Sequence, residues 1–483
     1  MSQNVVFIVM DTVRAGNFNP STASREPLST ISGPSTVFRQ TFTSAPWTLP
    51  SHASLFTGTT PSKHGAHAGH KHLDDTHTTL PEIVQNHGYE TVAVSNNTWI
   101  SEEFGFDQGF ETLYKTWQYV QSDTDFGRIA RQEEGLTKLT EATKALFDGN
   151  PITNLTNAIY GQFFRKNEDD GAARTNEWIE DWLTTRDDSR PFFLFVNYLE
   201  PHLEYRPPKA HAEEHLPEGV SYEEAMEIPQ NAWGYIADTV ELTNEDFEIL
   251  QALYRAEITH LQKKIEEVID LLKAEGEWDD TLFIVTSDHG ENIGEHGLMD
   301  HQYALYDTLL HVPLYIHGGP FEDDEINDSV QLLDLPPTIL DILDIDAPEA
   351  RDQFQGVSFH PDADDTREYA IAEYIAPQPS MEALEKRIGD LPEHVYTYDR
   401  SLRAIRTHDY KYIRGSDGSQ ELYALETDPE ETANIADTHD EVVADLDAKL
   451  DEWLDSFEQA ESDGETTIDE DTKTRLENFG YLQ

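Results

Sequence analysis

The chain has 483 residues, 37% of them hydrophobic and 10% aromatic, so it is long enough to bury a core in one large or two ordinary domains. Its 94 Asp and Glu residues outweigh 33 Lys and Arg, and the net charge of −61 argues against binding to nucleic acid or to an anionic membrane surface. The absence of cysteine excludes disulfides, thiolate metal sites and any reaction that starts from a Cys side chain.

The excess of carboxylates is spread along the chain. Concentrated salt screens the repulsion between such charges, so we expect a halophilic protein from a salt-in cytoplasm. The N-terminal residues Met1–Asn4 lead directly into an apolar run, without the basic region or cleavage site of a secretion signal. Apolar runs such as Val5–Met10 reach about a third of the length that spans a bilayer. We therefore expect a cytoplasmic protein without a membrane span, and the sequence does not indicate its oligomeric state.

Short apolar runs alternate with longer amphipathic segments, a pattern typical of parallel strands joined by helices, so the predicted fold class is α/β. The predicted strands are Val5–Met10, Thr91–Ser95, Phe192–Asn197, Leu282–Thr286 and Val312–His317. Before the fourth strand, helical spacing over Thr243–Ala274 predicts a long helix with Thr243 as its N-cap. The weakly periodic stretch 116–173 is interpreted as a variable helical insertion.

After Gly318–Pro320 the pattern changes to short runs separated by turn residues. These runs predict a small antiparallel sheet over Ser401–Arg406, Tyr410–Arg414 and Glu421–Ala424, and a helix over Glu441–Phe457. We therefore expect a catalytic domain over residues 1–345, a smaller C-terminal α+β subdomain over 346–457 and a solvated acidic tail over 458–483.

Polar residues follow the predicted strands, at the edge where open α/β sheets bind ligands. They are Asp11, Asn96, Glu200, His202, Asp288 and His289. Asp11 alone is weak evidence, because an Asp after a strand is more often a cap or turn residue. The segment Ser287–Glu291 is stronger, because its adjacent Asp and His offer an oxygen and an imidazole ligand to a divalent ion. His296 and His301 follow within the same loop.

The segment Thr48–Gly58 predicts a short helix, because Pro50 suits a first helical turn and Gly58 suits its end. Thr48 then lies at or just before the helix N-terminus, where backbone N–H groups favour an alkoxide nucleophile or a bound oxyanion. The alternative is that Thr48 only caps the helix, and this segment taken alone favours that interpretation.

Together these segments resemble the sulfatase family within the alkaline phosphatase superfamily. The resemblance rests on Asp11 after the first strand, Pro-Ser-x-x-x-Leu-Phe-Thr-Gly at 50–58, His202 in Glu-Pro-His and Ser-Asp-His-Gly-Glu at 287–291. Later landmarks extend it to Phe479–Leu482, near the end of the chain. It implies an α/β/α sandwich that holds one divalent metal ion, Ca²⁺, Mg²⁺ or Mn²⁺, beside a nucleophile at a helix N-terminus.

The resemblance also implies roles for individual residues. Carried over by position, the metal ligands would be Asp11, Thr48, Asp288 and His289. Thr48 would also be the nucleophile. His202 would act near the leaving group as an acid or an oxyanion stabiliser, the alternative being a loop histidine packed between Pro201 and Tyr205.

The sequence departs from the family pattern at positions that matter for the chemistry. Thr48 stands where sulfatases have the Cys or Ser that is oxidised to formylglycine, so no formylglycine is expected here. Four basic positions that hold sulfate in the family are here His52, Asn96, Thr98 and His301. Of these we expect His52 and His301 to be catalytic, and Asn96 and Thr98 to contact substrate.

These departures favour phosphate chemistry. A phospho-Thr can be cleaved at phosphorus, whereas a sulfo-Thr would have to be released by attack at sulfur, and the superfamily relatives with a Thr nucleophile are phosphodiesterases and phospho-group transferases. We therefore expect a metal-dependent hydrolase that cleaves a phosphate, phosphonate or sulfate ester of a small molecule, glycan or lipid. The alternatives are a sulfatase that works without formylglycine and a non-catalytic member that binds an anionic glycan.

A histidine-dense loop follows the predicted nucleophile helix. It contains His64, His67, His70, His72 and His77. One interpretation is a second metal site. The favoured one is a solvated loop of an acidic protein, with His64 kept as a possible substrate contact.

Overall fold

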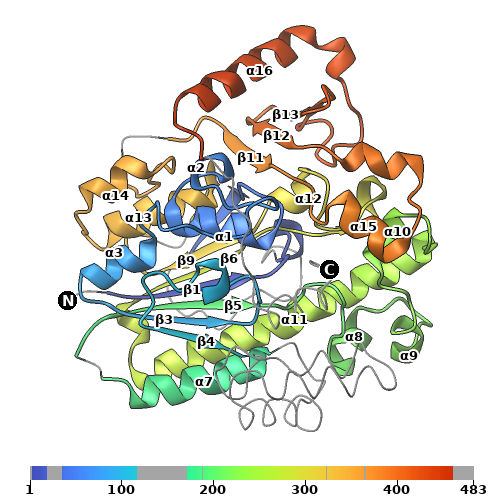
Figure 1. Ribbon diagram of the computed structural model, residues 1–483. Coiled ribbons are helices and arrows are strands. Elements are labelled where there is room, and N and C mark those ends of the chain that lie inside the picture. The colour runs from blue at the N-terminus through green and yellow to red at the C-terminus, as the bar shows by residue number, and fades with distance from the viewer. Residues whose placement is uncertain are drawn as a thin grey trace, which may run out of the picture.

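An eight-stranded sheet forms the centre of the molecule in the computed structural model (Figure 1). In spatial order its strands are β10 (Asp324–Gln331), β2 (Ser35–Phe42), β9 (Leu314–His317), β6 (Thr281–Ser287), β1 (Asn4–Met10), β5 (Phe192–Tyr198), β3 (Glu90–Ser95) and β4 (Thr112–Lys115). The structure describes residues 3–18, 35–116, 171–187, 189–321, 324–363 and 366–460. Apart from a few end residues, the predicted insertion and acidic tail lie outside these ranges.

All five predicted strands are present, and those at the centre of the sheet are buried along their whole length. Near-continuous apolar runs are typical of parallel strands covered on both faces. One expectation was wrong: β9 runs antiparallel to both β6 and β2. The reason is that the chain does not cross back after β6. It stays at the strand-end edge, where Gly290 and Glu291 donate backbone hydrogen bonds to Leu309 and Thr308, and β9 therefore starts from that edge.

Helices cover both faces of the sheet, which makes the predicted α/β/α sandwich (Figure 1). One face carries α7 (Ala172–Thr185) and α11 (Asn244–Glu275), and the other carries α1 (Thr48–Thr57), α3 (Leu80–Asn86) and α13 (Leu335–Ile342). The Thr243 side chain accepts a hydrogen bond from the Asp246 N–H, which confirms the predicted N-cap of α11. The shorter helices are α2 (Pro61–His64), α8 (Lys209–His215), α9 (Tyr222–Ala225), α10 (Ala232–Ile236), α12 (Asp307–Leu310), α14 (Pro348–Gln353) and α15 (Met381–Ile388).

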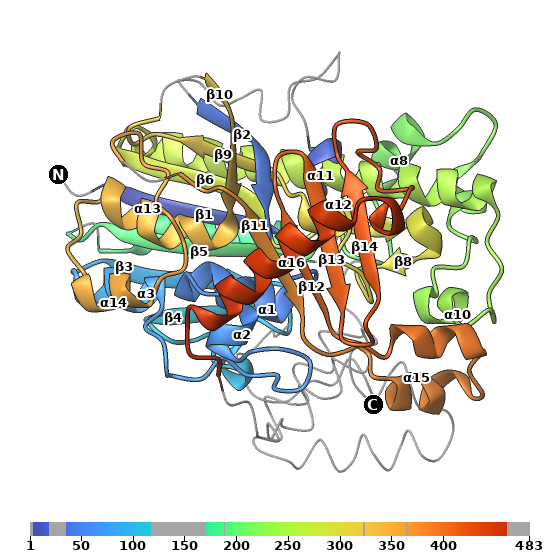
Figure 2. The same ribbon diagram turned by 90° about the horizontal axis from the view of Figure 1, so that it is seen from above.

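The C-terminal part forms the predicted antiparallel sheet and helix, with one further strand, β11, that the sequence patterns did not indicate. Its strands are β11 (Ala370–Tyr374), β12 (Leu402–Arg406), β13 (Tyr410–Gly415) and β14 (Gln420–Ala424), and its helix is α16 (Asp440–Asp455). Figure 2 shows α16 lying across this sheet. Ile405, Tyr412 and Leu450 belong to a separate apolar cluster between them. Whether the chain divides into domains at residue 345 stays a prediction.

A largely buried group of charges connects the C-terminal sheet to α12. We call Asp307, Arg406, Lys411 and Glu431 the junction cluster. Asp307 accepts from Lys411 Nζ at 2.9 Å and from Arg406 Nε at 3.0 Å, and Lys411 lies 2.7 Å from Glu431 Oε1. Every carboxylate of the cluster therefore has a basic partner.

Within the described ranges, none of the helices combines the length and the hydropathy that a bilayer crossing requires.

Candidate active site

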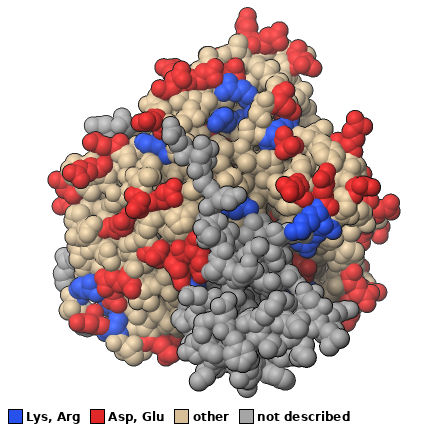
Figure 3. Space-filling model, in the orientation of Figure 1, with Lys and Arg blue, Asp and Glu red and all other residues tan. Residues whose placement is uncertain are grey.

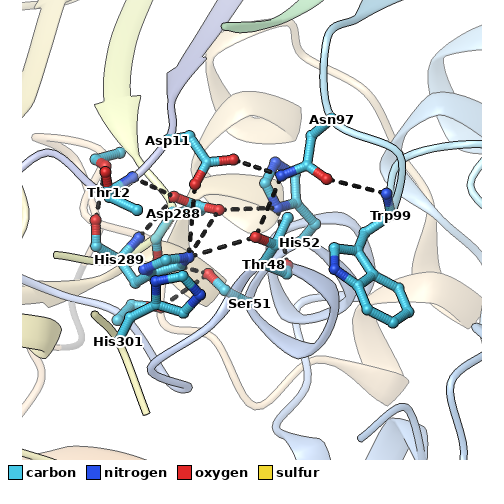
Figure 4. A network of polar contacts seen from close by, with 12 residues as sticks. Asp11, Thr12, Thr48, Ser51, His52, Asn97, Trp99, Asp288, His289 and His301 are labelled. Carbon is cyan, nitrogen blue, oxygen red and sulfur yellow. Dashed lines mark hydrogen bonds and ion pairs between the residues drawn. The ribbon is translucent and has the colours of Figure 1, made fainter. Parts of the chain in front are cut away.

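The parallel register of the central strands brings the predicted metal ligands together. Met10 pairs with Ser287 at the ends of β1 and β6, so that Asp11 and Asp288 follow side by side at the same edge. These two carboxylates and His289 are buried, and their donor atoms lie within 4.8 Å of one another (Figure 4). The strand ends thus bring together the three residues whose pattern predicted a metal site.

The hydrogen bonds of the two carboxylates leave one oxygen of each without a donor. Asp11 Oδ2 accepts from Asn97 Nδ2 at 2.5 Å, and Asp288 Oδ1 accepts from the backbone N–H groups of Thr12 and His289 at 3.3 and 2.9 Å. Asp11 Oδ1 and Asp288 Oδ2 make no hydrogen bond with the residues that the structure describes. They lie 3.8 and 3.4 Å from His289 Nε2. Buried oxygens left unpaired in this way call for a cation.

The tautomer of His289 suits the same ion. Its Nδ1–H donates to the Gly290 carbonyl at 2.9 Å, which leaves the Nε2 lone pair facing the two carboxylates. Burial lowers the pKa of His289 well below its usual range, so the ring is neutral. Burial also raises the pKa of Asp11 and of Asp288, and the negative charge of Asp11 raises the pKa of Asp288 further. Two oxygens and one imidazole nitrogen are a donor set that fits a divalent metal ion.

Thr48 is the first residue of α1, and its hydroxyl reaches this ligand set. The N-cap is Trp47 and no side chain caps the helix, so the interpretation of Thr48 as a simple cap was wrong. Thr48 Oγ1 lies 3.4 Å from His289 Nε2 and 3.4 Å from Asn97 Nδ2. One turn later, Ser51 Oγ donates to the Asp288 carbonyl at 2.7 Å, which fixes the start of the helix against the metal-ligand loop.

Asn97 is a site residue that the sequence reasoning missed. Its amide nitrogen donates to Asp11 and Thr48, while its Oδ1 accepts from the Trp99 N–H at 3.0 Å. The resemblance directed attention to its neighbours instead. Asn96 Oδ1 accepts from the hydroxyls of Thr116 and Thr175, away from Thr48. The signal that could have found Asn97 was its position after β3, at the same sheet edge as Asp11.

Asn96 and Thr98 stay predictions as substrate contacts. Both side chains are buried, and Asn96 Nδ2 and Thr98 Oγ1 make no hydrogen bond with the residues that the structure describes.

His52 stands beside the site as an uncharged residue. Its Nδ1–H donates to the Thr48 carbonyl at 2.9 Å, and its ring packs edge-on against Phe56, Phe106 and Phe195. Burial lowers the pKa of His52 to about 4. The imidazole therefore supports the first turn of α1 without the positive charge that the resemblance associates with this position. Its predicted catalytic role remains a prediction.

His202 and His301 flank the metal ligands. The His301 ring centroid lies 4.5 Å from that of His289 and 5.2 Å from that of His202. The Nδ1–H of His202 donates to the Leu203 carbonyl at 2.6 Å. Burial opposes the charge of His301, but the carboxylates of Asp300 and then Glu291 hold the pKa of His301 well above its usual range. Both predicted catalytic histidines therefore border the site.

His64 and the rest of the histidine-dense loop do not join the ligand set. His64 Nε2 donates to Ser54 Oγ at 3.1 Å and its Nδ1 accepts from the Ala66 N–H at 3.0 Å, so both nitrogens bind within the fold. In the described part of the chain, donor atoms converge closely enough for a metal in two groups, and neither contains a histidine of this loop. His296 is also absent from both, since it stacks on Tyr306.

Known proteins share this fold and sequence pattern. The family model described as Sulfatase matches residues 3–345. Arylsulfatase K of Bos taurus is 26% identical over 449 residues, which cover 86% of this chain and 74% of the relative. Choline-sulfatase of Rhizobium meliloti (strain 1021) is 26% identical over 465 residues, which cover 90% and 82%. The solved phosphonate monoester hydrolase of Agrobacterium radiobacter superposes with a TM-score of 0.67 at 19% identity, over 95% of this chain and 96% of that one.

Proposed function

This chain belongs to the sulfatase family and is an ester hydrolase, and we propose that it cleaves a phosphate or phosphonate ester by nucleophilic attack of Thr48. The observation that carries the proposal is the position of the Thr48 hydroxyl. It lies at the N-terminus of α1, 3.4 Å from His289 Nε2 and next to two buried carboxylates that each keep one oxygen unpaired. A hydroxyl at a helix N-terminus beside a ligand set of this kind suits an activated nucleophile.

The ligand set would hold one divalent ion, Ca²⁺, Mg²⁺ or Mn²⁺. Its donors would be Asp11 Oδ1, Thr48 Oγ1, Asp288 Oδ2 and His289 Nε2. When bound, the ion supplies Lewis-acid polarisation of the ester and lowers the pKa of the hydroxyl.

The side chains then divide the reaction between them. Asn97 Nδ2 donates to the Thr48 oxygen and so positions it. This oxygen attacks phosphorus and displaces the alcohol, while the proton of the Thr48 hydroxyl passes to bulk water. His202 delivers a proton from Nε2 to the departing alkoxide, because its Nδ1–H is held by the Leu203 carbonyl and its ring borders the site next to His301. Water then attacks the phosphorus of the phospho-Thr, which releases phosphate and restores the hydroxyl of Thr48.

The identity of the nucleophile favours phosphorus over sulfur. Formylglycine is an aldehyde, and oxidation of a Thr side chain cannot give one. A sulfo-Thr would therefore have to be released by attack at sulfur, whereas a phospho-Thr is hydrolysed at phosphorus. The phosphonate monoester hydrolase that superposes on this chain shows that the fold houses such esters elsewhere.

A sulfate ester is the second candidate substrate. It is favoured by the curated relatives, arylsulfatase K and choline-sulfatase, which cover most of this chain. Under this alternative the same Thr48 would form a sulfo-enzyme, and water would have to attack its sulfur atom.

Turnover of paired p-nitrophenyl esters distinguishes the two. The sulfate, the phosphate monoester, the phosphate diester and the phenylphosphonate would be compared in high salt with Ca²⁺, Mg²⁺ or Mn²⁺. We expect cleavage of the phosphorus esters. Thr48→Ala should reduce the rate at least about 10³-fold, Thr48→Ser should largely keep it, and chelation should abolish it. Thr57→Ala, at the other end of α1, is the matched control. Full turnover by Thr48→Ala would end the nucleophile assignment, and turnover of the sulfate alone would select the second candidate.

We also propose that the enzyme acts on a small-molecule, glycan or lipid ester in a salt-rich cytoplasm. Support comes from the net charge of −61 and from the surface, where Asp and Glu outnumber Lys and Arg over the face in Figure 3. Because salt screens this repulsion, the thermal midpoint should rise as KCl is raised from dilute buffer to molar concentration. An unchanged midpoint and activity in dilute buffer would contradict the halophilic assignment.

A further inference from the structure

A second convergent group of ligands adjoins the first. It consists of Glu291, Asp300 and His301, all buried, with one donor atom of each lying within 4.8 Å of the others. Local pairing produces this arrangement. The two-residue strands β7 (Asn292–Ile293) and β8 (Met299–Asp300) pair antiparallel with Asn292 opposite Asp300, which brings Glu291 close to His301. Figure 4 shows His301 next to His289, so the two groups are neighbours.

The charges of this group do not balance within the described protein. His301 Nδ1 lies 2.5 Å from Asp300 Oδ1 and 3.4 Å from Glu291 Oε1. A single N–H can make one good hydrogen bond, and the carboxylate of Asp300 lies closer to His301 Nδ1 than that of Glu291 does. Both oxygens of Glu291 then remain without a hydrogen bond to any residue that the structure describes, although the side chain is fully buried. Leaving a buried carboxylate uncompensated costs several kcal/mol.

A second orphaned group points to the same place. The Tyr205 hydroxyl is buried and makes no hydrogen bond with the described residues. Burial and then the charge of Glu291 raise the pKa of Tyr205 well above its usual range, so the phenol lies within the field of that carboxylate. The Tyr205 hydroxyl and the Glu291 carboxylate are thus two buried polar groups without a hydrogen bond to the described residues, and a cation would satisfy both.

We propose that Glu291, Asp300 and His301 bind a second divalent cation, which goes beyond the proposed function and its single metal ion. Two carboxylate oxygens and one imidazole nitrogen are the same protein donors that the first group offers, and this set suits a divalent ion such as Mn²⁺. The ion would take the place of the proton on His301 Nδ1. It would also bring positive charge to His301, one of the positions where the family pattern has a basic residue.

Metal stoichiometry tests this independently of any substrate. The full chain would be stripped with chelator and dialysed against micromolar Mn²⁺ in molar KCl, which suppresses weak binding by surface carboxylates. We expect two Mn²⁺ per chain for the wild type, one for Glu291→Gln and one for Asp288→Asn. Asp279→Asn, an exposed carboxylate change of the same charge, should keep two. Circular dichroism would confirm that each variant is folded.

The outcomes separate this proposal from the single-metal proposal. The wild type could bind only one Mn²⁺ per chain. If Asp288→Asn removes that ion and Glu291→Gln leaves it in place, the second site is overturned. If Glu291→Gln removes that ion and Asp288→Asn leaves it in place, the first site is overturned instead. Two ions retained by Glu291→Gln would also reject the assignment. An infrared band of a protonated carboxyl group, present in the metal-loaded wild type and absent from Glu291→Gln, would show that a proton compensates Glu291 instead.

Discussion

The junction cluster and the candidate active site both bury several carboxylates, but they balance them in opposite ways. Asp307 and Glu431 each lie within 3.0 Å of a nitrogen of Lys411 or Arg406. Asp11, Asp288 and Glu291 have histidine neighbours, and no ion pair with Lys or Arg is formed by these three in the described part of the chain. Buried carboxylates that are paired with Lys or Arg stabilise a structural contact. Buried carboxylates without such a partner indicate a site that binds a cation from solution.

Removing the base at the junction should have the largest effect on stability. Lys411→Met leaves two buried carboxylates with only Arg406 between them, so we expect a loss of about 3–5 kcal/mol in the free energy of unfolding. Urea denaturation in molar KCl measures it. The control is Lys449→Met, whose ion pair with Asp445 is half-exposed and contributes under about 1 kcal/mol. Equal losses in the two variants would contradict the structural role of the junction.

Removing metal should destabilise the active site and leave the junction unaffected. An ion that binds the folded chain alone, present at 100 times its dissociation constant, adds about 2.7 kcal/mol to the free energy of unfolding. We expect chelation to remove this increment from the wild type and to remove an equal increment from Lys411→Met. A chelator effect that vanishes in Lys411→Met would show that the two regions are coupled.

Neutralising one carboxylate should have opposite signs in the two regions. In metal-free buffer, Asp11→Asn should raise the free energy of unfolding by about 1 kcal/mol, because it relieves the burial cost and the repulsion with Asp288. Asp307→Asn should lower it, because Lys411 and Arg406 lose their shared partner. The same urea titrations decide this. Destabilisation by both variants would remove the distinction between the regions.

The junction cluster should also make the stability of the chain depend on pH. Burial, opposed by Lys411, raises the pKa of Glu431 to about 7. Between about pH 4.5 and pH 7 the folded chain therefore keeps a proton that the unfolded chain has released. This contribution to stability falls as the pH rises, by at most about 1.4 kcal/mol per pH unit. Glu431→Gln should flatten the profile across this window, while Glu430→Gln, exposed next to it, should not. Parallel profiles for Glu431→Gln and the wild type would refute the assignment.

Sequence patterns predicted the parts of the fold that are continuous in the chain. The buried central strands are unbroken apolar runs, and Asp11, Asp288 and His289 directly follow them, so their convergence could be foreseen. Strands β2, β4 and β10 were missed, because they mix polar and apolar residues near the edges of the sheet.

The finer parts of the site depend on geometry that no periodicity carries. Which residue after β3 turns towards Asp11 depends on the rotation of the chain there, and it is Asn97 rather than Asn96. The convergence of Glu291 with His301 depends on β7 and β8, which have two residues each and leave no strand pattern to read.

Trp47 immediately precedes Thr48, and its ring lies 5.4 Å from that of Trp99 in an edge-to-face contact. The backbone N–H of Trp99 in turn donates to the side chain of Asn97, and Lys71 Nζ lies 5.7 Å from the ring centroid of Trp99. Trp47 thus adjoins Thr48, the proposed nucleophile, and Trp99 contacts Asn97, whose amide lies next to Thr48. The enzyme therefore contains its own optical reporter: cation loading or ester binding should change the intrinsic fluorescence, and ligand affinities can be read from the unlabelled chain.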